Sequence, residues 1–448
     1  RRNSPPPRLL RALALLRNPS ELDGDGLGKA AAAAAREGLE DDAWWESFTA
    51  RARELAPHLA LHDASLVLNG MARARRLDRG LVEAMLPRIC SNLVYLTSAH
   101  LAMVASAIAK AEVHNPTFVS ALCRELKARL MEFQSPMEIT MVVNAVSKLR
   151  VTDDDLYRRF LAHTHNRMAH EAFHVRDLSV LVSGLARVQC VDANTMGKFT
   201  SCAIQTLPQA TPLELAKLMH ACMSVGCSAH DFFCACVLRN REQTMGMDPG
   251  GLSSAAFAFG QCFEAAEVAH LRYLRNIFRD IRIAAVASLP LFLPREIVSL
   301  LRTYARWQVS FDCEHLRKVA DRMKATREQF DAVSTVSGLY SLAVLMQRNA
   351  ARSVASPATR STWEAAGEAA LHLLEPAWRH IGAGKLDISL VLRAVEVSTI
   401  LQSGDAALFG AVSACIVRRH VDFDGPSCSA LYDFLAHLGR SPEEDVML

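Results

Sequence analysis

The sequence predicts an all-α solenoid built from about ten helix-turn-helix repeats of roughly 37 residues each. Half of the 448 residues are hydrophobic but only 6% are aromatic, a balance that favours helices over sheets. One apolar segment recurs along the chain at nearly constant spacing. Small residues recur at fixed places inside that segment, so neighbouring helices can approach closely. Together these features indicate a repeat architecture.

Each copy of the recurring segment begins with an apolar residue, here called the anchor, and continues as a helix. The sixth residue after the anchor is Ala or Gly in the first six copies. A second segment with apolar residues at helical spacing follows, as at Phe118, Leu122 and Leu126. A single hairpin of this kind cannot bury its apolar face, so consecutive repeats must stack. The predicted anchors are Leu66, Leu101, Ile139, Leu178, Leu215, Leu252, Ile297, Val333, Leu390 and Cys428.

The repeats define the expected domain organisation. The first residues are rich in Arg and contain no acid before Glu21, which is typical of an organelle transit peptide or of a disordered basic tail. No uninterrupted apolar run is long enough to predict a membrane span. The predicted segments are a basic, partly disordered stretch (1–29), N-terminal capping helices (30–60), the solenoid (61–440, with insertions near 284–293 and 350–362) and a C-terminal tail (441–448).

Motifs for catalysis are missing from the sequence. It has no phosphate-binding Gly-rich loop, no dinucleotide fingerprint and no G-x-S-x-G elbow, so we expect neither an enzyme nor a cofactor. Residues 170–174 match H-E-x-x-H, the helix motif of zinc peptidases. They end four residues before the anchor Leu178, where we expect a turn between repeats and no metal.

Four thiols and one imidazole lie together in a single repeat and are residue types that bind metal ions. Their spacing is not that of paired C-x-x-C ligands, and Cys222 falls on the apolar helix face. Reduced core cysteines are therefore the preferred interpretation. The cluster comprises Cys222, Cys227, His230, Cys234 and Cys236.

Basic residues recur at the position nine residues after the anchor, here called the first-helix row. This position lies about 180° from the anchor around the helix, so it faces away from the core. A polar position, five residues after the anchor, lies beside it and includes Arg302. Such rows can track a phosphate backbone, although cations also favour helix C-termini through the macrodipole. The predicted row comprises Arg75, Lys110, Lys148, Arg187 and Arg306.

A second basic surface, here called the arginine ridge, is predicted on two consecutive second helices. Its first four members share one helix face, with Asp280 as the only acid between them. Solvated faces normally mix both signs of charge, so the ridge indicates a polyanionic partner. The ridge comprises Arg272, Arg275, Arg279 and Arg282, followed by Arg317, Lys318, Arg322 and Lys324.

The repeated segments, such as LAMVASAIAKAEV from Leu101 and LSVLVSGLARVQC from Leu178, resemble those of organellar helical-repeat proteins. These are the heptatricopeptide-repeat and octotricopeptide-repeat groups, related to the FAST-kinase-like RNA-binding proteins. The resemblance covers roughly residues 60–440. It implies an α-solenoid of the mitochondrion, or alternatively the plastid, that binds organellar RNA. No RAP-type nuclease-like domain is recognisable after the last repeat, which favours binding without cleavage.

The expected function is therefore non-catalytic RNA binding in the mitochondrion. The expected partners are RNA, especially ribosomal RNA, and neighbouring proteins of a large assembly such as the mitochondrial ribosome. No membrane and no small-molecule substrate are expected. The alternative is a protein–protein scaffold within a mitochondrial complex, which the modest net charge of +3 also suits.

Overall fold

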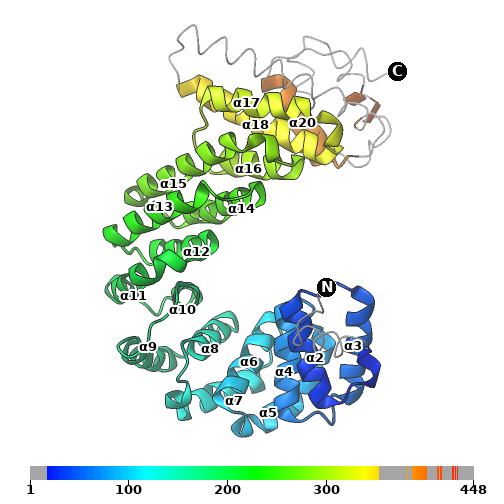
Figure 1. Cartoon of the computed structure of the whole chain (residues 1–448), viewed down its shortest axis with the longest axis vertical. Coiled ribbons are helices and arrows are strands. Elements are labelled where there is room, and N and C mark those ends of the chain that lie inside the picture. Colours follow the sequence, from blue (N-terminus) through cyan, green and yellow to red (C-terminus); the bar gives the residue numbers. More distant parts are fainter. Residues whose placement is uncertain are drawn as a thin grey trace, which may run out of the picture. The chain divides into compact units, whose positions relative to one another are not determined.

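The computed structural model describes residues 18–352, 381 and 386–400, together with 411, 412, 414, 415, 426, 427, 429 and 431. Within these residues the chain forms α-helices and short 3-10 turns, and no strand (Figure 1). The predicted all-α, helical-repeat solenoid fold is therefore confirmed. The chain divides into two compact units, residues 1–232 and 233–448, which are described separately.

The first unit is a stack of helical hairpins in two layers. Its first helices pack on one another in chain order, α2 on α4 and so on to α12. The first helices are α2 (Gly24–Glu37), α4 (Leu61–Ala74), α6 (Ser98–Lys110), α8 (Pro136–Lys148), α10 (Val175–Arg187) and α12 (Pro212–Ser224). The second helices are α3 (Asp42–Leu55), α5 (Arg79–Ser91), α7 (Pro116–Ala128), α9 (Asp154–Met168) and α11 (Ala193–Thr206).

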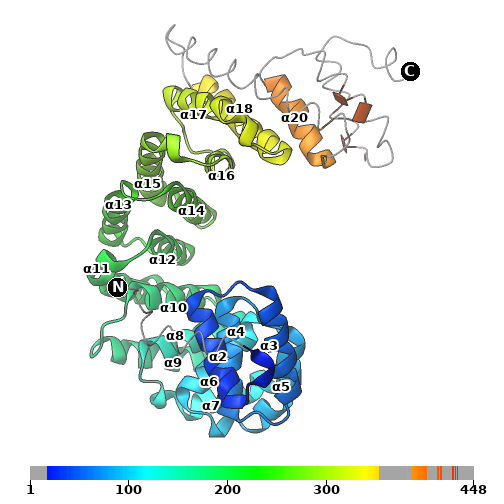
Figure 2. The ribbon, with the colours of Figure 1, turned by 45° about the vertical axis from the view of Figure 1, so that its right-hand side comes forward.

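The second unit, which begins within α13 (His230–Thr244), repeats this arrangement. Its first helices also pack in order, and α18 and α20 lie side by side in both views (Figure 2). The insertion predicted near 284–293 extends α15 to 20 residues and adds a 3-10 turn. The remaining helices are α14 (Pro249–Gly260), α15 (Val268–Ala287), α16 (Pro294–Arg306), α17 (Cys313–Ala325), α18 (Ala332–Arg352) and α20 (Ile388–Ile400).

Local sequence signals explain where the first helices begin. Proline occupies the first turn of α8, α12, α14 and α16, where its missing N–H costs no hydrogen bond. Thr211 and Glu214 close a capping box at the start of α12. The anchors Leu101, Ile139 and Leu178 are fully buried, as predicted.

A left-handed backbone residue ends most first helices and fixes the register of the repeats. It lies eleven residues after the anchor, as at Glu112 after Leu101. By this criterion the anchor of α4 is Ala64 and not Leu66, because the left-handed residue is Arg75 (φ 59°). Ala64 is 5% exposed, whereas Leu66 is less buried. The members of this left-handed set are Gly38, Arg75, Glu112, Arg150, Gln189, Gly226 and Gln308.

The predicted anchor of α18 is also shifted by two residues. Val333 is 51% exposed, whereas Thr335 is 5% exposed. In α20 the predicted Leu390 is buried at 9% exposure, and the neighbouring Val391 is fully buried. The anchor was predicted from its apolar character, and in α18 the polar Thr335 is the buried residue instead.

The N-terminal region predicted as a cap, residues 30–60, belongs to a hairpin of the same kind as the repeats. Its first helix α2 packs on α4, and Gly38 (φ 67°) lies eleven residues after the buried Leu27. The helix starts before residue 30, because the Asp23 carboxylate accepts a hydrogen bond from the Gly26 amide at 2.8 Å. Residues 24–29 are thus helical and not a disordered tail.

Some predicted features lie outside the described residues. These are the repeat predicted from Cys428, the insertion near 350–362 beyond residue 352, and the terminal segments 1–17 and 441–448.

The contact between α2 and α4 depends on Gly70. A Cβ at this position would lie 2.5 Å from the Ala31 Cβ and 2.7 Å from the Ala31 carbonyl carbon, which is backbone and cannot move aside. We expect Gly70→Ala to destabilise the protein by about 1–3 kcal/mol through overpacking. Gly197→Ala in α11, where a Cβ has open space, should instead stabilise it by about 0.5–1 kcal/mol. Urea denaturation measures the free energy of unfolding of both variants. Equal changes in the two would contradict the close approach of Gly70 to Ala31.

Candidate nucleic-acid interface

The first-helix row is present in the first unit, with one change of membership. Its residues end α4, α6, α8 and α10, and they are Arg73, Lys110, Lys148 and Arg187. All four are exposed. Arg73 replaces the predicted Arg75, because the anchor of α4 is Ala64 and the ninth residue after it is Arg73. Arg75 itself occupies the left-handed position beyond the helix end.

Consecutive members of this row lie within electrostatic reach of one another. Partial burial lowers the pKa of Lys110, and the neighbouring cations Lys148 and Arg73 lower it further. Burial also lowers the pKa of Lys148, as do Arg187 and Lys217, whereas Glu112 opposes the shift. The row is therefore a line of like charges that repel one another.

This repulsion bears on the macrodipole interpretation of the row. A helix C-terminus favours one cation, but it does not account for like charges on neighbouring helices, such as Arg73, Lys110 and Lys148. Arg187 is held near the preceding helix by a hydrogen bond from Nη1 to the Ser147 Oγ at 2.6 Å. Its pKa is lowered by burial. The helix macrodipole can therefore explain why any one helix ends in a cation. It does not explain why the cations of successive helices are aligned.

A groove of about 780 Å³ runs beside the row over α4, α6, α8, α10 and the start of α12. Arg73 and Lys110 line it together with polar side chains five residues after the anchors, Asn69, Ser106 and Asn144. The structure thus brings the predicted polar and basic rows together. Ser106 is only 7% exposed, so Asn69 and Asn144 are the more accessible amides.

The groove changes sign at its other end. Asp177 and Glu214 line it there, beside His174 and Arg176. Burial raises the pKa of Asp177, while Arg176 and His174 oppose that shift. The positive part of the groove is therefore confined to the α4–α8 side.

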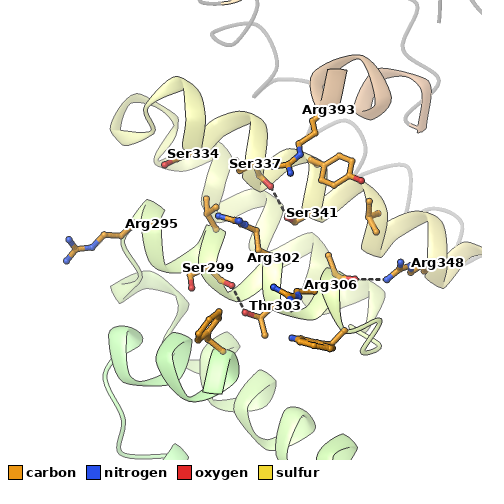
Figure 3. A pocket seen from close by; sticks show the side chains of 16 residues that line it. Arg295, Ser299, Arg302, Thr303, Arg306, Ser334, Ser337, Ser341, Arg348 and Arg393 are labelled. Carbon is orange, nitrogen blue, oxygen red and sulfur yellow. Dashed lines mark hydrogen bonds between the residues drawn. The ribbon is translucent and has the colours of Figure 1, made fainter. Parts of the chain in front are cut away.

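The second unit carries a different basic site, here called the arginine groove (Figure 3). It has a volume of about 630 Å³ and lies over α14, α16, α18 and α20. Hydroxyl groups and three aromatic rings line it as well, and none of its lining residues is acidic. Its arginines are Arg295, Arg302, Arg306, Arg348 and Arg393.

Several of these arginines have structural contacts. The Arg306 guanidinium lies 4.9 Å from the Trp307 ring centre and 3.3 Å from the Glu264 carboxylate. Arg348 donates from Nη1 to the Ala305 carbonyl at 2.6 Å, which satisfies the end of α16. Arg393 lies over the Tyr340 ring at 5.5 Å.

Arg302 differs from these three arginines. It is exposed and has neither a hydrogen bond nor an ion pair among the described residues. It lies between α16 and α18, near Ser337 and Arg306 (Figure 3). The sequence predicted Arg302 and Arg306 for the interface and missed Arg295, Arg348 and Arg393. The last two occupy other repeat positions, and only the packing of α18 and α20 brings them here.

The arginine ridge on α15 and α17 is not a continuous exposed surface. The Arg282 side chain is only 11% exposed, lies 2.8 Å from the Asp312 carboxylate and donates to the Ser310 carbonyl at 3.0 Å. Arg322 is half-buried and donates to the Phe292 carbonyl at 3.3 Å. This corrects the prediction for both residues, because they hold the loops around α15 and α17 in place.

Other members of the ridge are partly neutralised. Lys318 pairs with Glu314 at 3.0 Å, and Arg279 approaches Asp280 at 3.4 Å. Arg272 donates to the Tyr273 hydroxyl at 2.6 Å. Arg275 and Lys324 are exposed without an ion pair among the described residues, and Arg317 is half-buried. An RNA contact here remains a prediction for these exposed residues.

The histidine motif lies in a turn, as predicted. Helix α9 ends at Met168, and His174 is the residue just before α10, where its side chain makes no capping hydrogen bond. Among the described residues no three His, Cys, Asp or Glu side chains are arranged to hold a metal ion. Cys222, Cys227 and Cys236 are buried, and a hydrogen bond with Cys222 lowers the pKa of Cys227 to about 6. In the described part of the chain, no helix has the length and apolarity needed to cross a membrane.

Comparison with known families adds one decisive match. A family model described as RESC6, RNA-editing substrate-binding complex 6 protein, matches residues 58–365. That span exceeds two thirds of the 448 residues. The chain belongs to the RESC6 family. The RESC6 match includes the whole first-helix row and, apart from Arg393, the whole arginine groove. No curated protein matches the chain.

Membership of the RESC6 family is consistent with the broader resemblance to organellar RNA-binding helical-repeat proteins. It does not extend to the heptatricopeptide-repeat, octotricopeptide-repeat or FAST-kinase-like groups named from the sequence. The repeated anchors and small residues that carried the resemblance are general requirements of stacked helical hairpins, and so they do not discriminate between such families.

The repulsion along the first-helix row predicts a measurable coupling between its lysines. In Lys148→Gln the pKa of Lys110 should rise, because a neighbouring cation is lost. Both lysines have a folded-state pKa below the unfolded value of about 10.4, so the unfolded chain binds more protons between the two values. Stability of the wild type relative to Lys110→Gln/Lys148→Gln should therefore increase as pH rises through that window. NMR titration and thermal unfolding test this, and an unchanged Lys110 titration would contradict it.

The corrected role of Arg282 predicts a loss of stability. Arg282→Ala should destabilise the protein by about 1–2 kcal/mol, less than for a fully buried pair because Asp312 is 57% exposed. Arg275→Ala on the same helix should change stability by no more than about 0.5 kcal/mol. Urea denaturation of the two variants provides the comparison. Equal stabilities of the two variants would contradict the structural role of Arg282.

Proposed function

We propose that this protein is a non-catalytic, RNA-binding subunit of an RNA-editing substrate-binding complex, and that it holds RNA by its phosphates on the first-helix layer. The first-helix row, Arg73, Lys110, Lys148 and Arg187, is the observation that carries the proposal. The family description names an RNA-editing substrate-binding complex, which supports both the ligand and the presence of protein neighbours.

The row suits a phosphate backbone for electrostatic reasons. Adjacent packed helices are about 8–10 Å apart, so the row presents one cation per helix at regular intervals. These cations repel one another when free, and a bound polyanion relieves that repulsion. Contacts to phosphate position an RNA without reading its sequence. Asn69 and Asn144, in the groove beside the row, are suited to contact bases or ribose hydroxyls.

No catalytic step is part of this proposal. The one metal motif recognised in the sequence, H-E-x-x-H at residues 170–174, lies in a turn and not on a helix. The row and its groove offer mainly cations, amides and hydroxyls, which bind and orient RNA. A role in RNA delivery or retention requires nothing more.

We also propose a mitochondrial location, with the plastid as the alternative. The Arg-rich start of the sequence and the resemblance to organellar repeat proteins support it. The predicted ribosomal role and the preference for ribosomal RNA are not adopted, because the family description names an RNA-editing complex instead. The alternative to the proposed RNA-binding function is a protein–protein scaffold that makes no contact with RNA.

A salt series on single-stranded RNA tests the proposal. The variant Lys110→Gln/Lys148→Gln/Arg187→Gln should bind more weakly, and log K should fall less steeply with log salt. The slope should be shallower by about 0.7 for each lost phosphate contact. Fluorescence anisotropy with a labelled single strand of mixed sequence, repeated across salt concentrations, gives both quantities.

The matched control removes the same charge from the second helices of the same unit. Arg124→Gln/Arg158→Gln/Lys198→Gln alters exposed cations on α7, α9 and α11. If both triple variants lose affinity equally, net charge and not the row governs binding. If neither loses affinity, or the wild type binds no RNA, the scaffold reading replaces the proposal.

A further inference from the structure

The arginine groove differs in chemistry from the first-helix row. The row consists of separate cations on exposed helix ends, whereas the groove gathers guanidinium groups around a concave space of about 630 Å³. Pockets of roughly 300–1,000 Å³ typically enclose small ligands, so the groove has room for a nucleotide. Planar guanidinium groups bind phosphate oxygens in pairs, which a lysine ammonium cannot do.

The positive charge of the groove is not balanced by its surroundings. Its lining contains no acid, and two carboxylates near it are already engaged. Glu264 pairs with Arg306, and Glu396 contacts Tyr340, whose pKa is raised mainly by burial. Arg302 has neither a hydrogen bond nor an ion pair in the described structure, although four other arginines line the same groove. A bound anion would satisfy it.

An accessible aromatic ring lies in the same groove. Phe257 on α14 is 55% exposed and has no ring contact among the described residues. Trp307 stacks on Phe263, and Tyr340 is covered by Arg393, so Phe257 is the ring whose face remains open. Exposed aromatic rings beside cations are platforms on which unpaired bases stack.

We propose that the arginine groove binds one phosphate-bearing nucleotide of a single-stranded RNA. Its phosphate lies on Arg302 and Arg393, with Arg306 at the rim, and its base stacks on Phe257. The hydroxyls of Ser299 and Ser334 are placed to contact the ribose. The identity of the ligand as RNA rests on the proposed function, but the side chains differ from those of the first-helix row. A base-paired duplex cannot enter this way, because its bases are already stacked.

The phosphate of that nucleotide has two possible sources, an internal phosphodiester or a terminal 5′-phosphate. Short single-stranded tetranucleotides distinguish them when compared with a 5′-phosphate and with a 5′-hydroxyl. Equal affinity assigns an internal phosphate, and a clear preference for the 5′-phosphate assigns the end of the RNA.

Calorimetry with the full-length chain and these tetranucleotides tests the groove. Arg302→Gln/Arg393→Gln should weaken binding at least about tenfold. Phe257→Ala should weaken tetranucleotide binding while leaving the affinity for inorganic phosphate unchanged. The control Arg124→Gln/Arg241→Gln removes the same charge from exposed positions on α7 and α13 and should bind like the wild type. Circular dichroism confirms that each variant is folded.

The outcomes separate this inference from the proposed function. The row variant should retain tetranucleotide binding while losing affinity for long RNA. If groove variants bind the tetranucleotide like the wild type, the inference fails and the proposed function stands on the row alone. If the groove binds the tetranucleotide but removing the row does not affect long RNA, the proposed use of the row fails and the groove inference stands.

Discussion

Close packing of the first helices is the constraint on which the rest of the structure depends. Gly70 rests directly on the backbone of Ala31, and Gly184 lies 3.3 Å, measured from its would-be Cβ, from the Cα of Asn144. Large side chains at these positions would hold the helices apart. Because these positions carry no large side chains, equivalent residues of successive repeats lie near each other. A residue type that recurs at one repeat position therefore forms a continuous surface. The line of cations in the first unit is the clearest example.

The two basic sites show two ways of using that constraint. In the first unit equivalent positions carry like charges, and neighbouring cations lower the pKa of Lys110 and Lys148. In the second unit the arginines come from different repeat positions, and they converge on one concave space. A row distributes contacts along a polymer, whereas a groove concentrates them on one unit of it. The same helical hairpins can therefore form both an extended binding surface for a polymer and a local site for one of its units.

Much of the fold was predictable from the sequence, because hydrophobic periodicity and small residues are local signals. Lys110, Lys148 and Arg187 were found in this way, since each closes its helix in the same register. The shift from Arg75 to Arg73 was not predictable, because Leu66 resembles an anchor more than Ala64 does. Arg282, Arg348 and Arg393 were misjudged or missed for a different reason. Their surroundings come from segments tens of residues away, and helix periodicity carries no information about such partners.

The left-handed residue that ends the first helices has a consequence for how such proteins diverge. Seven helix ends share this backbone state, at Gly38, Arg75, Glu112, Arg150, Gln189, Gly226 and Gln308. Five of the seven are not glycine, and at these five the left-handed backbone costs about 1–2 kcal/mol each. The same hydrogen bond closes the turn at each helix end, as from the Val113 amide to the Ile108 carbonyl at 3.4 Å. The repeats therefore share a backbone conformation at this position, but they do not share a residue type. Gene duplication followed by mutation can erase the resemblance between repeats while their length stays the same, which leaves a degenerate sequence motif over a regular architecture.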